Sequence, residues 1–170
     1  AASSVLATMA SIPGSVLSDD ALASGTLVLE EARRFLDAAE LMWLAELDRR
    51  GVTEAEFGQR SAAWLAHEAN LPRAVATARV TTARKVTGEL AGVGDALREG
   101  SIGFDHARVL ADVANPRNTD GLAGVTGELC DAARLASFSR WQAEVRGLAA
   151  QLDADGGHDQ QEGAELRSED

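Results

Sequence analysis

Basic side chains gather in one part of an otherwise acidic sequence. The 170 residues carry a formal net charge of −11, which argues against a general affinity for nucleic acid. Residues 60–90 nevertheless hold only two acidic groups, Glu68 and Glu89, against five basic ones. The basic groups are Arg60, Arg73, Arg79, Arg84 and Lys85. Arginine and lysine bind phosphate oxygens and base edges, so this basic island is where the sequence predicts a DNA contact.

The segment after Pro72 arranges most of the basic island on one helix. Successive residues turn by about 100°, which places Arg73 and Arg84 on the same face, with Arg79 and Lys85 beside it. No carboxylate occurs between Ala69 and Gly88. The predicted DNA-binding residues are Arg73, Thr77, Arg79, Thr81, Arg84 and Lys85.

A shorter helix is predicted just before this basic helix. It has the sequence SAAWLAHEANL, with Ser61 as its N-cap. A short helix, a connection of about three residues and a longer helix are typical of a helix-turn-helix. The same pattern is common in all-α proteins, where a basic face is often only solvated. A DNA-binding corner and a packing corner therefore both remain open.

The other reactive side chains do not form a catalytic pattern. His106 follows Gly103 on the first turn of a predicted helix and precedes apolar residues, so we expect a packing and hydrogen-bonding role at a helix corner, with a partner contact as the alternative. His67 is expected to be structural or solvent-facing. The single cysteine, Cys130, excludes an internal disulfide and is predicted to be an inert buried thiol. The sequence predicts no catalytic residue, metal site or cofactor, and hence no enzyme within this chain.

A long helix over residues 26–50 is the predicted scaffold, ended by Gly51. Its apolar side chains recur every three or four residues, which predicts one face packed in the core. That predicted inner face consists of Leu29, Ala32, Leu36, Ala39, Trp43 and Leu47. Four further apolar residues lie off it and would supply a homodimer interface: Phe35, Leu41, Met42 and Leu44.

The remaining pattern predicts an all-α fold of about six to seven helices with a helix-turn-helix-like core. Further helices are expected near 61–70, 72–87, 89–99, 104–114, 119–136 and 138–152. Trp43, Trp64 and Trp141 are each expected to anchor the core. Residues 1–25 form an N-terminal segment, residues 26–152 the domain, and residues 153–170 an acidic disordered linker that leads to a further domain. No apolar run spans a membrane, and the lone cysteine favours a cytoplasmic location.

Residues 27–156 resemble a known family. The motifs that carry the likeness are LAELDRRG, AAWLA with the basic helix after it, and DALREGSIGFDHARVL. They resemble the actinobacterial domain of unknown function 222, also called the 13E12-repeat family. The same stretch is more distantly similar to the helix-turn-helix region of the ParB and KorB plasmid-partition proteins. The cap before the HA pair departs from the usual serine or threonine, since Gly103 stands there.

The resemblance implies a place in a larger protein. Members of that family usually carry a histidine–asparagine–histidine (HNH) endonuclease domain further toward the C-terminus and are often associated with mobile elements. The leading hypothesis is thus a helical DNA-binding or DNA-targeting domain of an HNH-endonuclease-type protein, with weak binding to duplex DNA. The alternative is a helical interaction or dimerisation module that does not touch DNA.

Overall fold

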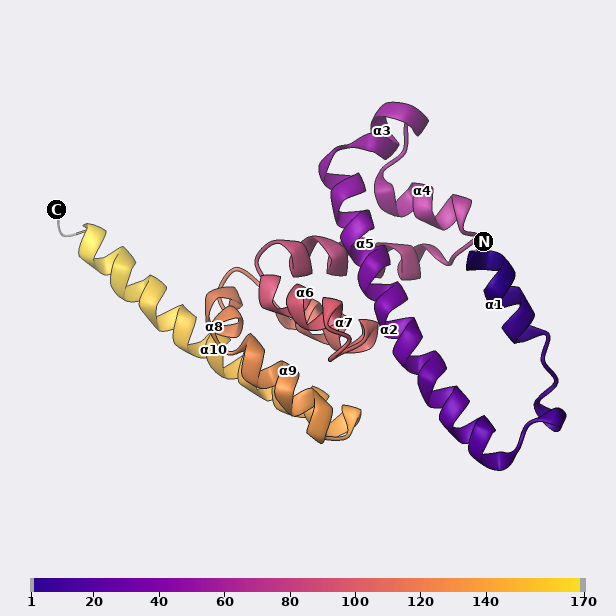
Figure 1. Ribbon diagram of the computed structural model, residues 1–170. Helices are drawn as coiled ribbons and strands as arrows, with labels where there is room; N and C mark the ends of the chain where they lie inside the picture. The colour runs from indigo at the N-terminus through magenta and orange to yellow at the C-terminus, as the bar shows by residue number, and fades with distance from the viewer. Residues whose placement is uncertain (1, 169–170) are drawn as a thin grey trace. The chain divides into compact units, whose positions relative to one another are not determined.

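The computed structural model describes the backbone of residues 2–168 and the side chains of residues 4–154 (Figure 1). Within these residues the fold is entirely helical, as predicted, but it has ten α-helices instead of six to seven. The helices are α1 (Ala2–Ala10), α2 (Asp19–Arg49), α3 (Val52–Phe57), α4 (Ser61–Glu68), α5 (Arg73–Thr87), α6 (Ala91–Arg98), α7 (Phe104–Val113), α8 (Thr119–Gly124), α9 (Thr126–Leu135) and α10 (Phe138–Ser168). A 3₁₀ turn lies at Gly14–Val16.

The chain forms two units, residues 1–33 and residues 34–170. The second unit holds the core. Helices α5, α6 and α7 pack on one another through small and branched side chains that are almost fully buried, and α10 adds Trp141 and Val145. These α5–α7 side chains are Ala76, Val80, Ala83, Val86, Val93, Leu97, Ala107, Val109 and Leu110. Alanine at several of these positions lets the helix backbones approach closely.

Helices α5 and α6 approach each other closely at Gly94. A Cβ atom added to this glycine would lie 2.3 Å from the carbonyl oxygen of Val86. The sequence places two glycines inside α6, Gly92 and Gly94, which would ordinarily weaken a helix. Gly94 is therefore required by the crossing of two backbones rather than by the helix that contains it.

The inner face predicted for the long helix is wrong. Leu36 and Trp43 are 59% and 75% exposed, whereas Leu41 and Leu44 are 1% and 5% exposed. The part of α2 that belongs to the second unit therefore packs in the core with Leu41 and Leu44, two of the four residues assigned to a dimer interface, whereas Phe35 of that set is 46% exposed. Of the predicted core face, Leu36 and Trp43 are exposed, while Ala39 and Leu47 are partly buried. The physical reason is that α2 carries apolar side chains at helical spacing on two faces, and periodicity alone does not say which of them meets the core.

Four further features differ from the predicted ones. Helix α2 begins at Asp19 rather than near residue 26, and the helix expected over 119–136 is divided at Val125. Helix α3 occupies a stretch predicted to be a loop, between Gly51 and Gly58, whose φ angles of 63° and 65° are left-handed. Arg60, not Ser61, is the N-cap of α4, because the Ser61 hydroxyl is buried against the Thr53 hydroxyl at 3.2 Å.

Helix α10 continues to Ser168, past residue 152, where the sequence predicts that the last helix ends and an acidic linker begins. The side chains from residue 155 onward lie outside the described residues. Rapid amide exchange in this segment stays a prediction.

The helix ends predicted at Gly51 and Gly100 are confirmed by left-handed φ angles of 63° and 70° at these glycines, and Gly103 is the N-cap of α7 as expected.

Candidate functional site

The two helices predicted to form a helix-turn-helix are α4 and α5. The connection is short, with Asn70 in the left-handed region at φ 49°, and the Leu71 N–H donates to the Ala66 carbonyl at 2.9 Å. Pro72 is the N-cap of α5. Leu65 of α4 and Ala76 of α5 are buried. The two helices therefore form one packed corner with a defined outer face.

The outer face of α5 is the one that the sequence predicts. Arg73, Thr77, Thr81 and Arg84 are all exposed. Arg73 lies in the first turn of the helix, and no hydrogen bond or ion pair holds its side chain within the described part of the chain. Arg73 is thus a cation of this face that remains available to an external anion.

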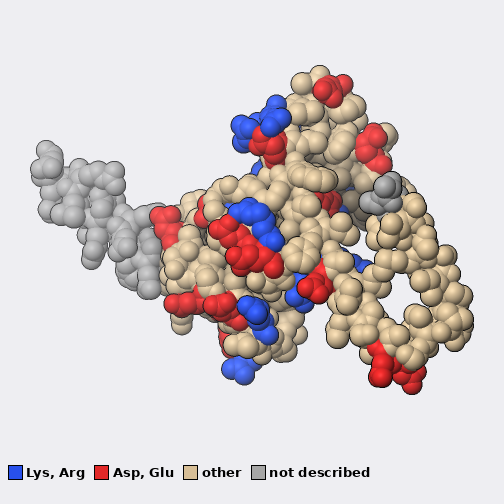
Figure 2. Space-filling model, viewed as in Figure 1, with Lys and Arg blue, Asp and Glu red and all other residues tan. Residues whose placement is uncertain are grey.

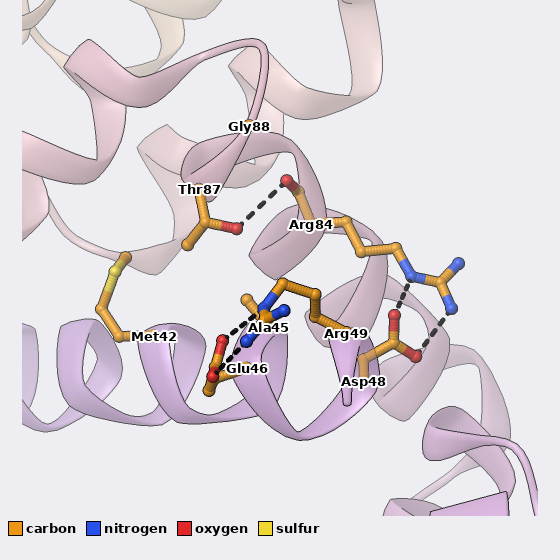
Figure 3. Close-up of a pocket in the computed structure, with 8 residues that line it drawn as sticks. All are labelled: Met42, Ala45, Glu46, Asp48, Arg49, Arg84, Thr87 and Gly88. Carbon is orange, nitrogen blue, oxygen red and sulfur yellow. Dashed lines mark hydrogen bonds and ion pairs between the residues drawn. The ribbon is translucent and has the colours of Figure 1, made fainter. Parts of the chain in front are cut away.

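The guanidinium of Arg84, by contrast, is held by a carboxylate of α2. It donates two hydrogen bonds to Asp48, with N–O distances of 2.6 and 2.8 Å (Figure 3). The Asp48 side chain is only 17% exposed. Hydrogen bonding from Arg84, aided by Ser61, lowers the pKa of Asp48 below its ordinary value, and the same pair raises the pKa of Arg84. This bidentate pair joins α2 to α5.

Arg79 and Lys85 face inward and also have internal partners. Arg79 donates to both carboxylate oxygens of Glu40 at 2.6 Å, and its guanidinium lies 5.9 Å from the centre of the Phe104 ring. The Lys85 ammonium donates to the carbonyls of Ala111 and Ala114 at 2.7 and 2.5 Å. Free carbonyls at a helix end attract cations, so Lys85 caps the C-terminus of α7. Both residues stabilise the fold.

Acidic partners are the reason that the basic island does not form one basic surface. On the face drawn in Figure 2, Lys and Arg side chains lie beside Asp and Glu side chains and form no continuous positive patch. Glu40 and Asp48 lie 39 and 36 residues before the arginines that they bind. A charge count over residues 60–90 could not reveal them. The one signal in the sequence is that Glu40 and Asp48 lie eight residues apart on the same predicted helix, and therefore near one face of it.

A groove of about 450 Å³ lies beside the Asp48–Arg84 pair (Figure 3). Its charged groups also bind one another. Glu46 accepts hydrogen bonds from Arg49 and Arg50, which lowers the pKa of Glu46 to about 2. The groove thus presents ion pairs in place of a general acid, a general base or a nucleophile.

His67 is exposed, and the packing predicted for His106 and the burial predicted for Cys130 are confirmed. The His106 ring packs edge-on against Phe138 and Trp141, with centroid distances of 5.0 and 4.7 Å. Burial and, to a smaller extent, the Arg34 cation lower the pKa of His106, which favours the neutral imidazole. The side chain of His67 is 73% exposed. Burial raises the pKa of Cys130 to about 11, as expected of an inert thiol.

The tryptophans differ from one another. Trp141 anchors the core at 1% exposure and donates its indole N–H to the Leu129 carbonyl at 2.8 Å. Trp64 is half-buried and stacks on Phe57. Trp43 is 75% exposed, so the prediction that it anchors the core is wrong.

Within residues 4–154, no cluster of three His, Cys, Asp or Glu side chains is placed to hold a metal ion. The described helices include none with the length and hydropathy of a membrane span.

Helix α2 exposes a series of large apolar side chains. In helix α2, Leu22, Leu29, Leu36 and Trp43 follow one another at intervals of seven residues and are 40%, 46%, 59% and 75% exposed. We call these four residues the heptad face. The same helix also exposes Leu27 at 71% and Val28 at 58%. Leu29, Leu36 and Trp43 of this face are residues that the sequence pattern predicts in the core.

A comparison with protein families identifies the chain. The model described as "Domain of unknown function (DUF222)" matches residues 26–169. This range begins inside α2 and includes both the α4–α5 corner and α10. Searches of curated proteins and of solved structures give no match. Because the family model covers most of the chain, the protein belongs to the DUF222 family, as its sequence motifs predict.

Proposed function

We propose that this chain is a helical interaction module, and that its partner is a second copy of itself. The observation that carries the proposal is the exposed heptad face of α2. Monomeric proteins rarely expose extended contiguous apolar surface. On this face the exposed fraction increases along the helix, from 40% at Leu22 to 75% at Trp43.

The spacing of the heptad face argues for a helix as the partner. Apolar residues repeated every seven positions form the seam along which α-helices pair in coiled coils. Three positions after the first three large residues stand Gly25, Ala32 and Ala39. Alternation of large and small side chains lets two helices interdigitate closely. A helix with this pattern is complementary to another copy of itself, and such self-complementarity favours a two-fold dimer.

The first unit supports the same conclusion. None of its described side chains is buried, and an apolar groove of about 390 Å³ is lined by residues of α1 and the start of α2. A chain segment without a buried core does not offset the entropy of ordering it. Leu6, Met9 and Leu29 are among the residues that line this groove. Contact with a second copy would supply the missing burial.

The test is the oligomeric state of the chain, measured by sedimentation equilibrium. We expect a concentration-dependent dimer, which the double substitution Leu29→Glu and Leu36→Glu converts to a monomer, because each glutamate places a charge in an apolar interface. Leu135→Glu is the matched control: Leu135 is 90% exposed but lies on α9, away from the heptad face. A wild-type chain that stays monomeric, or a double variant that still dimerises, would reject the proposal.

DNA targeting is the second candidate, as part of an HNH-endonuclease-type protein. The observation in its favour is the exposed, carboxylate-free outer face of α5, with Arg73, Thr77 and Thr81. Since the other three cations of the helix have internal partners, we expect about one phosphate contact and a salt slope near −0.9, rather than the −3.6 expected for four contacts. Binding by the wild-type chain should be weak and non-specific.

The variant that tests DNA targeting is Arg73→Ala, measured by fluorescence anisotropy with a labelled duplex at low salt. Loss of the phosphate contact should abolish binding while the fold stays intact, because Arg73 is exposed and has no hydrogen bond or ion pair among the described residues. Arg140→Ala is the control, since Arg140 pairs with Glu144 on the surface of α10. If the wild-type chain binds no duplex, or if Arg73→Ala binds equally well, the α4–α5 corner serves packing alone.

A further inference from the structure

We propose that a second site, the pocket between Arg34, Ser101, His106 and Arg134, binds a phosphate group. The pocket has a volume of about 360 Å³ and is independent of the heptad face and of the α5 outer face. It is built by three helices and a turn: Arg34 comes from α2, Ser101 from the turn before α7, His106 from the start of α7 and Arg134 from the last turn of α9. All four lie in the second unit.

The two arginines of the pocket are unlike those elsewhere in the second unit that bind carboxylates. Arg79 and Arg84 each form a short bidentate pair with a carboxylate. The Arg34 guanidinium makes a long hydrogen bond of 3.3 Å to the Gly100 carbonyl. No ion pair or hydrogen bond holds Arg134 among the described residues. Two guanidiniums that line one cavity can bind an oxyanion, because the planar guanidinium fork matches phosphate oxygens.

Packing holds two parts of the pocket wall, the His106 ring and the turn at Gly100. The His106 ring is held against Phe138 and Trp141. Gly100 has a left-handed φ of 70°, and a Cβ atom there would lie 2.7 Å from the Phe35 ring. The turn that carries Ser101 therefore lies against Phe35 of α2. Groups that are held in place before a ligand arrives lose less entropy when it binds.

The charged groups around His106 give the site a titratable reporter. Burial and, to a smaller extent, Arg34 lower the pKa of His106, Asp105 opposes them, and Glu99 and Arg134 line the same pocket. A bound dianion would offset the repulsion between Arg34 and the imidazolium. By reciprocity, the anion should raise the pKa of His106 and bind more tightly as the pH falls. Glu99 opposes anion binding through its own charge.

The experiment follows the imidazole resonances by NMR in pH titrations of the whole chain. Sulfate is the first probe, since it stays dianionic throughout and has the shape of phosphate; inorganic phosphate and glycerol 3-phosphate follow. Sodium chloride at equal ionic strength is the reference. We expect sulfate to raise the pKa of His106 by about 0.5–1 pH unit. His67, exposed on α4, is the internal control and should not respond.

Three variants decide the assignment. Arg134→Ala should weaken sulfate binding about tenfold, and its exposed position leaves the fold intact. Glu99→Gln should strengthen binding about threefold by removing a repulsive charge. Arg140→Ala, on α10, should change nothing. Tighter binding of glycerol 3-phosphate than of inorganic phosphate would identify a phosphomonoester as the ligand, and the reverse would identify free phosphate. Equal effects of sulfate and chloride on His106, or unchanged binding in Arg134→Ala, would overturn the proposal.

Discussion

At the scale of single residues, most basic side chains of α5 bind groups on neighbouring helices instead of facing solvent. Arg79, Arg84 and Lys85 bind Glu40, Asp48 and the end of α7. Residue type alone cannot distinguish an arginine that binds phosphate from one that binds an internal carboxylate, because the guanidinium presents the same donors to both. The difference depends on what α2 places opposite each side chain.

The Asp48–Arg84 pair gives the first prediction. Asp48→Asn should lower the free energy of unfolding by about 1 kcal/mol at neutral pH, since Arg84 is largely exposed and the pair is partly screened. The pKa of Asp48 is depressed in the folded state, so its contribution is present above the unfolded value and is lost as the pH falls through the folded value. Urea unfolding at several pH values measures both effects.

Glu144→Gln is the reference for this prediction. Glu144 pairs with Arg140 along α10, and both side chains are more than half exposed. Exposed pairs of this spacing contribute about 0.3–0.5 kcal/mol. Equal destabilisation by the two substitutions would show that Asp48 does not hold α2 on α5.

Cys130 gives the second prediction at this scale. Its thiol is buried, and burial raises its pKa to about 11. The thiolate is the reactive form, so Ellman's reagent should react slowly at pH 8 with the native chain and quickly after denaturation. Rapid labelling of the native protein would contradict the burial of α9 against the core.

At the scale of helices, the glycines of the second unit have separate roles that a substitution can distinguish. Gly94→Ala should destabilise the fold by about 1–3 kcal/mol, because the added Cβ would meet the backbone of Val86 at 2.3 Å and one helix must move. Gly147→Ala on α10 meets nothing within 4 Å and should stabilise the fold by about 0.5–1 kcal/mol. Thermal unfolding monitored by circular dichroism measures both. A neutral Gly94→Ala would mean that α5 and α6 do not cross this closely.

The helices also show how far the sequence predicts this fold. Patterns that depend on neighbouring residues correctly predict the all-α class, the α4–α5 corner, and the helix ends at Gly51 and Gly100. The sequence pattern does not predict the buried face of α2, because both faces of this helix are apolar. Only the arrangement of the other helices decides that Leu41 is buried and Leu36 exposed. The carboxylate partners of Arg79 and Arg84 were missed for the same reason. Both errors concern contacts between segments distant in sequence.

At the scale of the whole molecule, the two units differ in what stabilises them. The second unit has its own core, whereas the described side chains of residues 4–33 include none that is buried. A chain shortened to residues 34–154 should therefore unfold cooperatively, with a midpoint close to that of the full chain under conditions where the full chain is monomeric. Calorimetry tests this expectation. Loss of the cooperative transition on shortening would show that the first unit contributes to the core.

Internal pairing of the basic side chains also sets how association should respond to salt. Arg79, Arg84 and Lys85 bind groups within the chain. Two copies therefore approach each other as molecules that each carry a net charge of −11. Two such copies repel one another across water, and added salt screens this repulsion. Self-association should therefore tighten as the salt concentration rises, whereas contact with DNA phosphates weakens. A single salt series thus gives the two candidate functions slopes of opposite sign.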